Sequence, residues 1–364
     1  MARGAIACLS TKNLLHNYRT LQKLAPKSLI MPMIKANAYG HGIRSVAKRL
    51  SSEDGLFSFG VASIEEALAL RAVGIINNIT LMEGVFTPDE LQIASKNNFD
   101  IVIHNQAQLT WLNNLDQLPS KLNVWLKIDT GMGRLGFPCS MAQEAYRTLT
   151  NIAHIQKVIG VMTHFACADK IDHECNAKQI ANFNQYLKHI PGFKSLCNSA
   201  ATFNFQDYHC DVIRPGISLY GISPISGSSA QDLNLKPVMS LWSQIISIKN
   251  IEASQTIGYN ADYVATKDMK IAIIAMGYGD GYPRSARNDT PVIINGKRCA
   301  IVGRVSMDMI AVDLSNCLDA QIGDKVELWG HSLPVEEVAT YTSNISYDMI
   351  TNIQYRVKFE WQDD

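Results

Sequence analysis

SLIMPMIK, residues 28–35, is the first of eight short apolar runs that extend to residue 216. Most runs are separated by stretches with helical periodicity, such as SIEEALALRAVG (63–74), in which Leu68 and Ala72 share one side. A repeating order of strand and helix is typical of a parallel sheet, and eight such units predict a closed α/β barrel of the (β/α)₈ type. A doubly wound open sheet is the alternative. The other runs are LFSFGVA (56–62), NITLMEG (78–84), FDIVIH (99–104), LNVWLKID (122–129), IQKVIGVMTHF (155–165), FKSLCNS (193–199) and CDVIRPG (210–216).

The sequence pattern changes after residue 220. SGSSAQ (226–231) is a polar stretch of small residues that marks a domain boundary. Alternating β-rich runs follow it, and Asn295-Gly296 between PVII and KRCAI is a strong hairpin signal. We therefore predict a barrel domain over residues 1–234 and a mostly antiparallel β domain over residues 235–364. Residues 1–10 are interpreted as a strand, and whether that strand joins the second domain stays open.

The composition restricts the classes of partner. The 364 residues are 47% hydrophobic and 18% charged, with zero net charge, so the chain carries no electrostatic footprint for nucleic acid or an anionic membrane. No stretch reaches the roughly 20 apolar residues that a spanning helix needs. The eight cysteines form no C-x-x-C pair, which indicates free thiols in a reducing cytoplasm. We expect a cytoplasmic protein without a metal site.

Unusual polar residues stand at the ends of five predicted strands. In a (β/α)₈ barrel these ends lie on one face, where active sites are built. A lysine in such a place can form a Schiff base with a carbonyl compound when its pKa is lowered, although Lys35 alone could equally be a strand-end lysine that reaches solvent. The residues at this rim are Lys35, Lys127, Asp129, Arg134, His164, Asn198, Ser199 and Arg214.

A different motif near the rim is misleading. GMGRLG (131–136) fits the G-x-G-x-x-G fingerprint of dinucleotide-binding sites. It lies in the fifth strand–helix unit rather than the first, and Pro138 follows it closely. We therefore do not expect a nucleotide site there.

MIKANAYGHG (33–42) resembles the cofactor-lysine segment of the alanine racemases, which use pyridoxal 5′-phosphate (PLP). That family has an N-terminal (β/α)₈ barrel, a C-terminal β domain and a homodimer with shared active sites. This chain departs from the family at one place: shortly after Tyr355 it has Lys358, where many relatives carry Val-Pro. Further segments resemble the family in the same order: WLKIDTGMGRLGF (125–137), THFA (163–166), NSAA (198–201), VIRPGISLYG (212–221), TIGYNADY (256–263), GYGDGYPR (277–284) and GRVSMDM (303–309).

The resemblance implies a role for each matching residue. Lys35 holds the cofactor and serves the D-alanine face as a base, while Tyr263 of the other subunit serves the L-alanine face. Arg214 faces the pyridine nitrogen, with His164 beside it. Arg134 binds the substrate carboxylate. The phosphate is held by Asn198, Ser199, Gly216, Ile217, Tyr39 and Tyr355. The remaining assignments are a carboxylated Lys127 that positions Arg134, Met307 of the partner at the carboxylate, and Tyr282 and Tyr355 at the entry.

The resulting functional prediction is an isomerase that interconverts L- and D-alanine and supplies D-alanine for peptidoglycan. Three alternatives stay open: a broad-specificity amino-acid racemase, a PLP decarboxylase of the same fold, and a PLP carrier without activity. A decarboxylase needs no opposing base at Tyr263, and it places an acid rather than Arg214 at the ring nitrogen.

Overall fold

The computed structural model describes residues 4–363, so residues 1–3 and 364 of the two predicted domains lie outside the described residues. The described chain forms two compact units. The N-terminal unit comprises residues 17–219 and 224–228, and the C-terminal unit comprises residues 4–16, 220–223 and 229–363. Residues 4–16 and 229–234 therefore group with the C-terminal unit, whereas the predicted boundary lies at residue 234.

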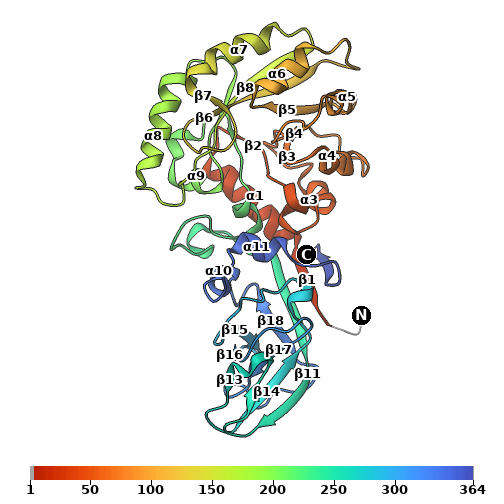
Figure 1. The fold of residues 1–364 in the computed structure, drawn as a ribbon, viewed down its shortest axis with the longest axis vertical. Helices are drawn as coiled ribbons and strands as arrows, with labels where there is room; N and C mark the ends of the chain where they lie inside the picture. The colour runs from red at the N-terminus through yellow and green to blue at the C-terminus, as the bar shows by residue number, and fades with distance from the viewer. Residues whose placement is uncertain (1–3, 364) are drawn as a thin grey trace. The chain divides into compact units, whose positions relative to one another are not determined.

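Eight parallel strands of the N-terminal unit form a ring. Figure 1 shows several of them, β2 to β8, with helices α3 to α8 around them. Strands β3-β4-β5-β6-β8-β9 form one sheet in that order, and β10 pairs with β2. Phe57 N donates to Ile30 O at 2.8 Å and Asp211 N donates to Lys194 O at 3.1 Å, which joins the pair to both edges of the sheet. The predicted barrel is confirmed. The strands are β2 (Leu29–Ile30), β3 (Phe59–Val61), β4 (Ile79–Leu81), β5 (Phe99–Ile103), β6 (Leu122–Asp129), β8 (Ile155–Met162), β9 (Phe193–Ser195) and β10 (Val212–Ile213); β7 (Phe137–Pro138) adds to β6.

The barrel strands are apolar because both of their faces are covered. Every residue of β3, β4 and β5 is buried, as expected for parallel strands covered by helices. Pro88 in the first turn of α5 and Asn105 at the N-cap of α6 start two of these helices. The helices are α1 (Thr11–Leu24), α2 (Lys35–Tyr39), α3 (Ile43–Leu50), α4 (Ile64–Arg71), α5 (Pro88–Lys96), α6 (Gln106–Asn113), α7 (Ala142–Asn151), α8 (Glu174–Asn182) and α9 (Ser199–Asn204).

The C-terminal unit is a second, smaller barrel of antiparallel strands. Strands β14-β17-β16-β15-β18-β11 follow one another, and β11 also pairs with β14, which closes the ring. The predicted hairpin turns at Asn295 and Gly296, whose φ values of 49° and 73° suit a tight two-residue turn. The strands are β11 (Met239–Ile251), β14 (Met269–Ile274), β15 (Pro291–Ile294), β16 (Lys297–Ile301), β17 (Ile310–Asp313) and β18 (Lys325–Trp329).

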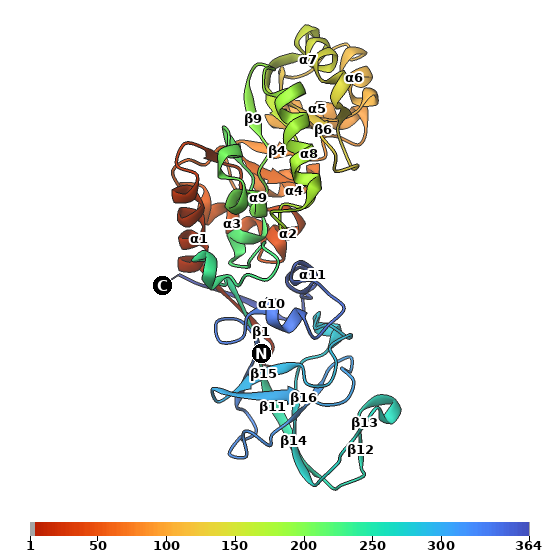
Figure 2. The ribbon, with the colours of Figure 1, turned by 90° about the vertical axis from the view of Figure 1, so that its left-hand side faces the viewer.

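Smaller elements complete this unit. Strand β1 (Ile6–Ser10) pairs with β11 and with β19 (Lys358–Gln362). A two-stranded arm of β12 (Thr256–Ile257) and β13 (Tyr263–Val264) extends from the barrel beside β14 (Figure 2). Two short helices, α10 (Val335–Ala339) and α11 (Ser346–Thr351), follow β18 along the chain.

The described residues include no helix that is both long and apolar enough to span a bilayer. Within the same residues, no group of three or more His, Cys, Asp or Glu side chains is arranged to hold a metal ion. The eight cysteines are free thiols.

Candidate active site

The carboxyl ends of the barrel strands carry a concentration of positive charge. Lys35, Lys127, Arg134 and Arg214 all lower the pKa of His164 through their charges, after burial, which has the largest effect. Glu83 is the acid that opposes this charge at Lys127. The rim therefore suits an anionic ligand, because several cations lie together with little internal compensation.

Arg214 lies at the centre of this rim and is buried. Its Nη1 donates to Ser195 Oγ and its Nη2 to Thr163 O, each at 2.5 Å. Nη2 also lies 3.2 Å from Nδ1 of His164. Burial lowers the pKa of Arg214 only to about 10, so the guanidinium stays cationic at neutral pH. Within the described chain, its Nε–H donates to no other group and is therefore available to a ligand.

His164 is neutral in this environment because burial and the surrounding cations lower its pKa. A guanidinium can only donate, so Nδ1 of His164 accepts from Arg214, and Nε2 lies 3.4 Å from the amide nitrogen Nδ2 of Asn198. The histidine thus adds no second positive charge beside Arg214.

Lys127 lies in β6 and is 7% exposed. Burial, followed by the charges of Arg214, Arg134 and Lys35, lowers the pKa of its amine from 10.5 to about 8. A large fraction of the amine is therefore unprotonated near pH 8. An unprotonated amine is the form that reacts with CO₂, so the chemistry of this lysine fits the predicted carboxylation.

Small residues after β9 and β10 form a cradle of donors. Ser199 Oγ accepts from Gly216 N at 2.8 Å and from Ser218 N at 3.3 Å, and it lies 3.0 Å from Ser218 Oγ. A Cβ on Gly216 would lie 2.3 Å from the hydroxyl oxygen of Tyr39, so no other residue fits there without displacing that tyrosine. Ile217 is buried, which leaves its backbone as the part that can face a ligand. Backbone N–H groups and hydroxyls gathered at one point suit the oxygens of a phosphate.

Asn198 supports this cradle from within the protein. Its Oδ1 accepts from Ala201 N at 3.0 Å and so caps α9, while its Nδ2 donates to Phe165 O at 3.3 Å. The side chain is therefore committed to the loops that carry His164 and Ser199.

The segment after Lys35 has an unusual backbone. Ala36, Asn37, Ala38 and Tyr39 all have φ between 51° and 55°, so α2 is a left-handed turn. Each L-residue in that region costs roughly 1–2 kcal/mol. Glu66 offsets part of this cost, because its carboxylate accepts from Ala36 N at 2.7 Å and from Ala62 N at 2.8 Å. The turn places Lys35 and Tyr39 at its two ends.

Arg134 lies on an exposed loop that a single carboxylate organises. The Oδ atoms of Asp129 accept from the backbone N–H of Gly131, Met132 and Gly133 at 2.8–3.2 Å. GMGRLG is thus a loop curled around Asp129, followed by β7 rather than by the helix that a dinucleotide site would need.

Two tyrosines predicted for the site lie inside the C-terminal unit instead. Tyr263 packs into a cluster with Ile257 and Met269, and its hydroxyl points to Met269 Sδ at 3.9 Å. Burial and nearby acids raise the pKa of Tyr263, which makes it a weaker base. Tyr282 is 1% exposed and stacks on Trp329 at 5.9 Å. Tyr282 is therefore closed to a ligand, and Tyr263 is only partly exposed.

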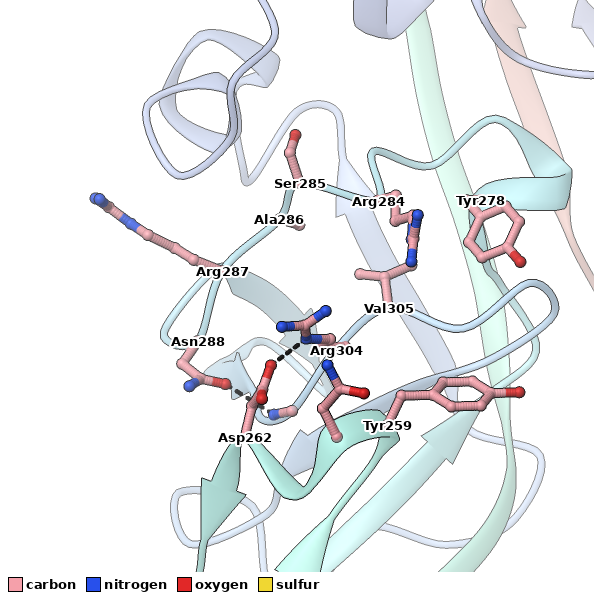
Figure 3. Close-up of a pocket in the computed structure, with 12 residues that line it drawn as sticks. Tyr259, Asp262, Tyr278, Arg284, Ser285, Ala286, Arg287, Asn288, Arg304 and Val305 are labelled. Carbon is pink, nitrogen blue, oxygen red and sulfur yellow. Dashed lines mark hydrogen bonds and ion pairs between the residues drawn. The ribbon is translucent and has the colours of Figure 1, made fainter.

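The neighbouring tyrosines Tyr259 and Tyr278 are accessible. They are 68% and 38% exposed, and both line a pocket of about 950 Å³ together with Asp262, Arg284 and Arg304. Figure 3 shows the two hydroxyls directed the same way, while Asp262 pairs with Arg304. Arg284 lies 5.7 Å from the ring centre of Tyr278.

Tyr259 and Tyr278 are not among the residues predicted from the sequence, although their spacing is the same as that of the predicted pair. Nineteen residues separate Tyr259 from Tyr278, and the same number separate Tyr263 from Tyr282. The spacing therefore could not choose between the two pairs, whereas burial does.

The remaining predicted residues also lie on the C-terminal unit. Met307 is 53% exposed, and its carbonyl accepts from Gly279 N at 2.8 Å, which ties its loop to the turn that carries Tyr278. Arg356 braces this region, because it donates to Asp280 at 2.6 Å and to Asp308 at 2.5 Å. Tyr355 is 95% exposed.

Comparisons with known proteins agree with this architecture. Residues 9–224 match the family model for the alanine racemase N-terminal domain, and residues 238–361 match that for the C-terminal domain. The chain is 44% identical to the alanine racemase of Shewanella loihica, over 94% of each chain, and 40% identical to that of Vibrio vulnificus, over 99% of this chain and all of the relative.

Solved structures give the same result. The biosynthetic alanine racemase from Pseudomonas aeruginosa has a TM-score of 0.94 at 38% identity, and that from Bartonella henselae, which has covalently bound pyridoxal phosphate, has 0.88 at 31%. Each comparison covers 99% of both chains. This chain belongs to the alanine racemase family.

Proposed function

We propose that this chain interconverts L- and D-alanine with PLP, and that its substrate site is completed by a second copy of the chain. The observation that carries the proposal is the cationic rim with its donor cradle, at the strand ends of a barrel that belongs to the alanine racemase family. An amino acid and a phosphorylated cofactor are both anionic, and this rim suits both.

The residues present fit the cofactor. The cradle of Ser199, Gly216, Ile217 and Tyr39 would hold the phosphate, with Tyr355 as a further hydroxyl. Lys35, at the start of the left-handed turn, would hold the carbonyl carbon. When bound, PLP supplies an electron-withdrawing ring that weakens the Cα–H bond of the substrate.

Arg214 is the residue that we assign to the ring nitrogen. Its remaining Nε–H can donate to that nitrogen but cannot receive a proton from it or keep it protonated. An unprotonated ring nitrogen withdraws less electron density from Cα, so negative charge at Cα is short-lived. Rapid return of a proton to Cα favours racemisation over decarboxylation, which is why Arg214 disfavours the decarboxylase alternative.

Racemisation needs a proton removed from one face of Cα and another delivered to the opposite face. Lys35 is proposed for the D-alanine face. For the L-alanine face we propose Tyr259 of the partner subunit in place of Tyr263, because Tyr259 is exposed and Tyr263 is packed. We likewise propose Tyr278, which lines the same pocket as Tyr259, for the entry in place of Tyr282.

Arg134 is proposed to bind the substrate carboxylate through its guanidinium fork. The lowered pKa of Lys127 supports its carboxylation, and the resulting negative group would pair with Arg134. The backbone N–H of Met307 of the partner subunit would be a second donor to the carboxylate. These assignments imply a homodimer, which we propose to be cytoplasmic and to supply D-alanine for peptidoglycan.

A substrate panel tests the proposal. The purified protein with PLP is incubated with single L-amino acids, and the products are separated by chiral chromatography. We expect D-alanine to form from L-alanine, with no loss of total amino acid. Equal turnover of many amino acids would favour the broad-specificity racemase, and release of CO₂ would favour the decarboxylase.

A second experiment tests the cofactor anchor. Lys35→Ala removes the amine that would hold PLP, so the visible absorbance of the protein-bound cofactor should disappear. Persistence of that band in the variant would contradict the assignment of Lys35. Lys48→Ala, at a lysine in α3 outside the rim, serves as the control and should keep the band.

A further inference from the structure

Gln179 in α8 is a buried polar residue that none of the roles above explains. It is 2% exposed, yet three of its hydrogen bonds reach two different loops of the active-site rim. Its Nε2 donates to Thr130 Oγ1 at 3.1 Å and to His164 O at 2.8 Å. Its Oε1 accepts from Ala166 N at 2.9 Å.

The orientation of this amide is fixed by its partners. Ala166 N–H can only donate and His164 O can only accept. A flipped amide would therefore place its NH₂ group against the N–H of Ala166 and its oxygen against the carbonyl oxygen of His164. Losing these partners would leave buried polar groups unsatisfied, which is costly. Gln179 therefore joins the two loops in one arrangement.

The two loops carry the residues assigned to substrate and cofactor. Thr130 begins the loop that is curled around Asp129 and carries Arg134 four residues later. Its hydroxyl also lies 2.7 Å from that of Thr163, whose carbonyl accepts from Arg214. Asn182, one helical turn after Gln179, donates to Thr130 O at 2.9 Å. Helix α8 thus binds both the hydroxyl and the carbonyl of Thr130, the residue at which the Arg134 loop begins.

We propose that Gln179 is a positioning residue that fixes the Arg134 loop relative to His164, and so sets the affinity for the carboxylate of the substrate. The proposal rests on the function proposed above, because it assigns Arg134 to that carboxylate. In such sites, displacing a binding group by even about 1 Å greatly lowers catalytic efficiency.

Gln108 offers a matched control. It is also a glutamine on a barrel helix, 1% exposed, and it also accepts from a backbone N–H at a strand end, that of His104 at 2.9 Å. Its Nε2 donates to Val85 O at 3.2 Å. The loops that it joins carry no residue assigned to substrate or cofactor.

The experiment compares the steady-state kinetics of Q179M and Q108M as holoenzymes. We expect Q179M to raise the KM for L-alanine about tenfold, with kcat changed less than threefold. Q108M should leave KM within twofold, even if both variants lower the melting temperature equally. An unchanged KM in Q179M, or an equal rise in both variants, would overturn the proposal.

A second variant guards against failure to fold. Q179E keeps the volume and the oxygen that accepts from Ala166, but it places a second oxygen against His164 O. It should also raise KM, and its visible PLP absorbance reports whether the cofactor site is intact. A Q179E enzyme with normal absorbance and normal KM would count against the proposal.

R134Q separates this inference from the proposed function. If R134Q does not raise KM, the assignment of Arg134 to the carboxylate fails. If R134Q raises KM and Q179M does not, only the role of Gln179 fails. If both roles hold, the double variant should have nearly the KM of R134Q alone, because the loop then has nothing left to position.

Discussion

At the scale of single residues, the site depends on how the protein environment changes ordinary side chains. Arg214 remains cationic although it is buried, and burial together with the charges of Arg214 and its neighbours keeps His164 neutral. Burial, followed by the charges of Arg214, Arg134 and Lys35, lowers the pKa of Lys127 to about 8. The shift at Lys127 has the direction that its proposed carboxylation needs, because burial and like charges both disfavour the protonated form of a lysine.

The two tyrosines of the β12–β13 arm give a prediction at this scale. Tyr259→Phe removes the proposed acid–base hydroxyl, so removal of the Cα hydrogen from L-alanine should slow by about 10²–10⁴-fold. Deuterium exchange from each enantiomer measures this step, and the loss should be larger for L-alanine than for D-alanine.

Tyr263→Phe is the matched control for that experiment. Its hydroxyl contacts Met269 Sδ inside the unit, so the variant should exchange deuterium at nearly the normal rate. The reverse result, with Tyr263→Phe inactive and Tyr259→Phe active, would restore the assignment made from the sequence.

At the scale of elements, the left-handed turn α2 stores strain where the cofactor lysine is placed. Four consecutive residues have positive φ, and none of them is glycine. The surrounding hydrogen bonds, including those from Glu66, hold the turn in place. Strain of this kind is found where a protein fixes a functional group precisely.

Ala36 allows this strain to be measured, because it is exposed and has φ of 52°. Ala36→Gly relieves the steric cost of that conformation, so the free energy of unfolding should rise by about 1 kcal/mol. Chemical denaturation of the apoenzyme measures the change.

Ala177→Gly provides the contrast, because Ala177 is exposed within the right-handed helix α8. That substitution should lower the free energy of unfolding by about 1 kcal/mol. If the two variants shift stability in the same direction, the turn does not carry the strain described.

At the scale of the whole molecule, Asp100 links stability to pH. It lies near the start of β5 and is 5% exposed. Burial raises the pKa of its carboxyl to about 6, against the opposing effects of Asn123, Arg71 and Lys157. The native state therefore favours the protonated acid, and this stability is present below about pH 4 and is lost as pH rises through 6.

Asp100→Asn should remove this pH dependence. At pH 7.5 the variant should be more stable than the parent by up to about 3 kcal/mol, since each pKa unit corresponds to about 1.4 kcal/mol. At pH 4 the two proteins should be nearly equal. Denaturant titrations at both pH values measure the difference, and a variant that is less stable at pH 7.5 would show that Asp100 is needed as a carboxylate.

The proposed sharing of sites between subunits is also a property of the whole assembly. Lys35→Ala and Tyr259→Phe lie on different units of the chain, and each should inactivate both sites of its own homodimer. Refolding an equal mixture should produce heterodimers with one intact site, so about a quarter of normal activity should return. If the mixture stays inactive while size-exclusion chromatography shows dimers, both groups come from the same chain.

The barrel, the C-terminal β domain and the N-terminal rim could be predicted from the amino-acid sequence. Strand–helix alternation, the Asn295-Gly296 turn and polar residues at strand ends are local patterns, and local patterns follow from covalent geometry and hydrophobic periodicity. Lys35, Arg134, His164 and Arg214 could be placed at one rim because parallel strands bring their carboxyl ends together.

The accessibility of each tyrosine and the hydrogen bonds that join the rim loops could not be predicted in this way, because both depend on how the chain packs. Tyr259 and Tyr263 have the same spacing to a later tyrosine, and only packing against Ile257 and Met269 separates them. Gln179 looked like an ordinary helix residue, because its partners Thr130 and Ala166 are distant in sequence. Burial and long-range hydrogen bonds depend on contacts between remote segments, which no local pattern encodes.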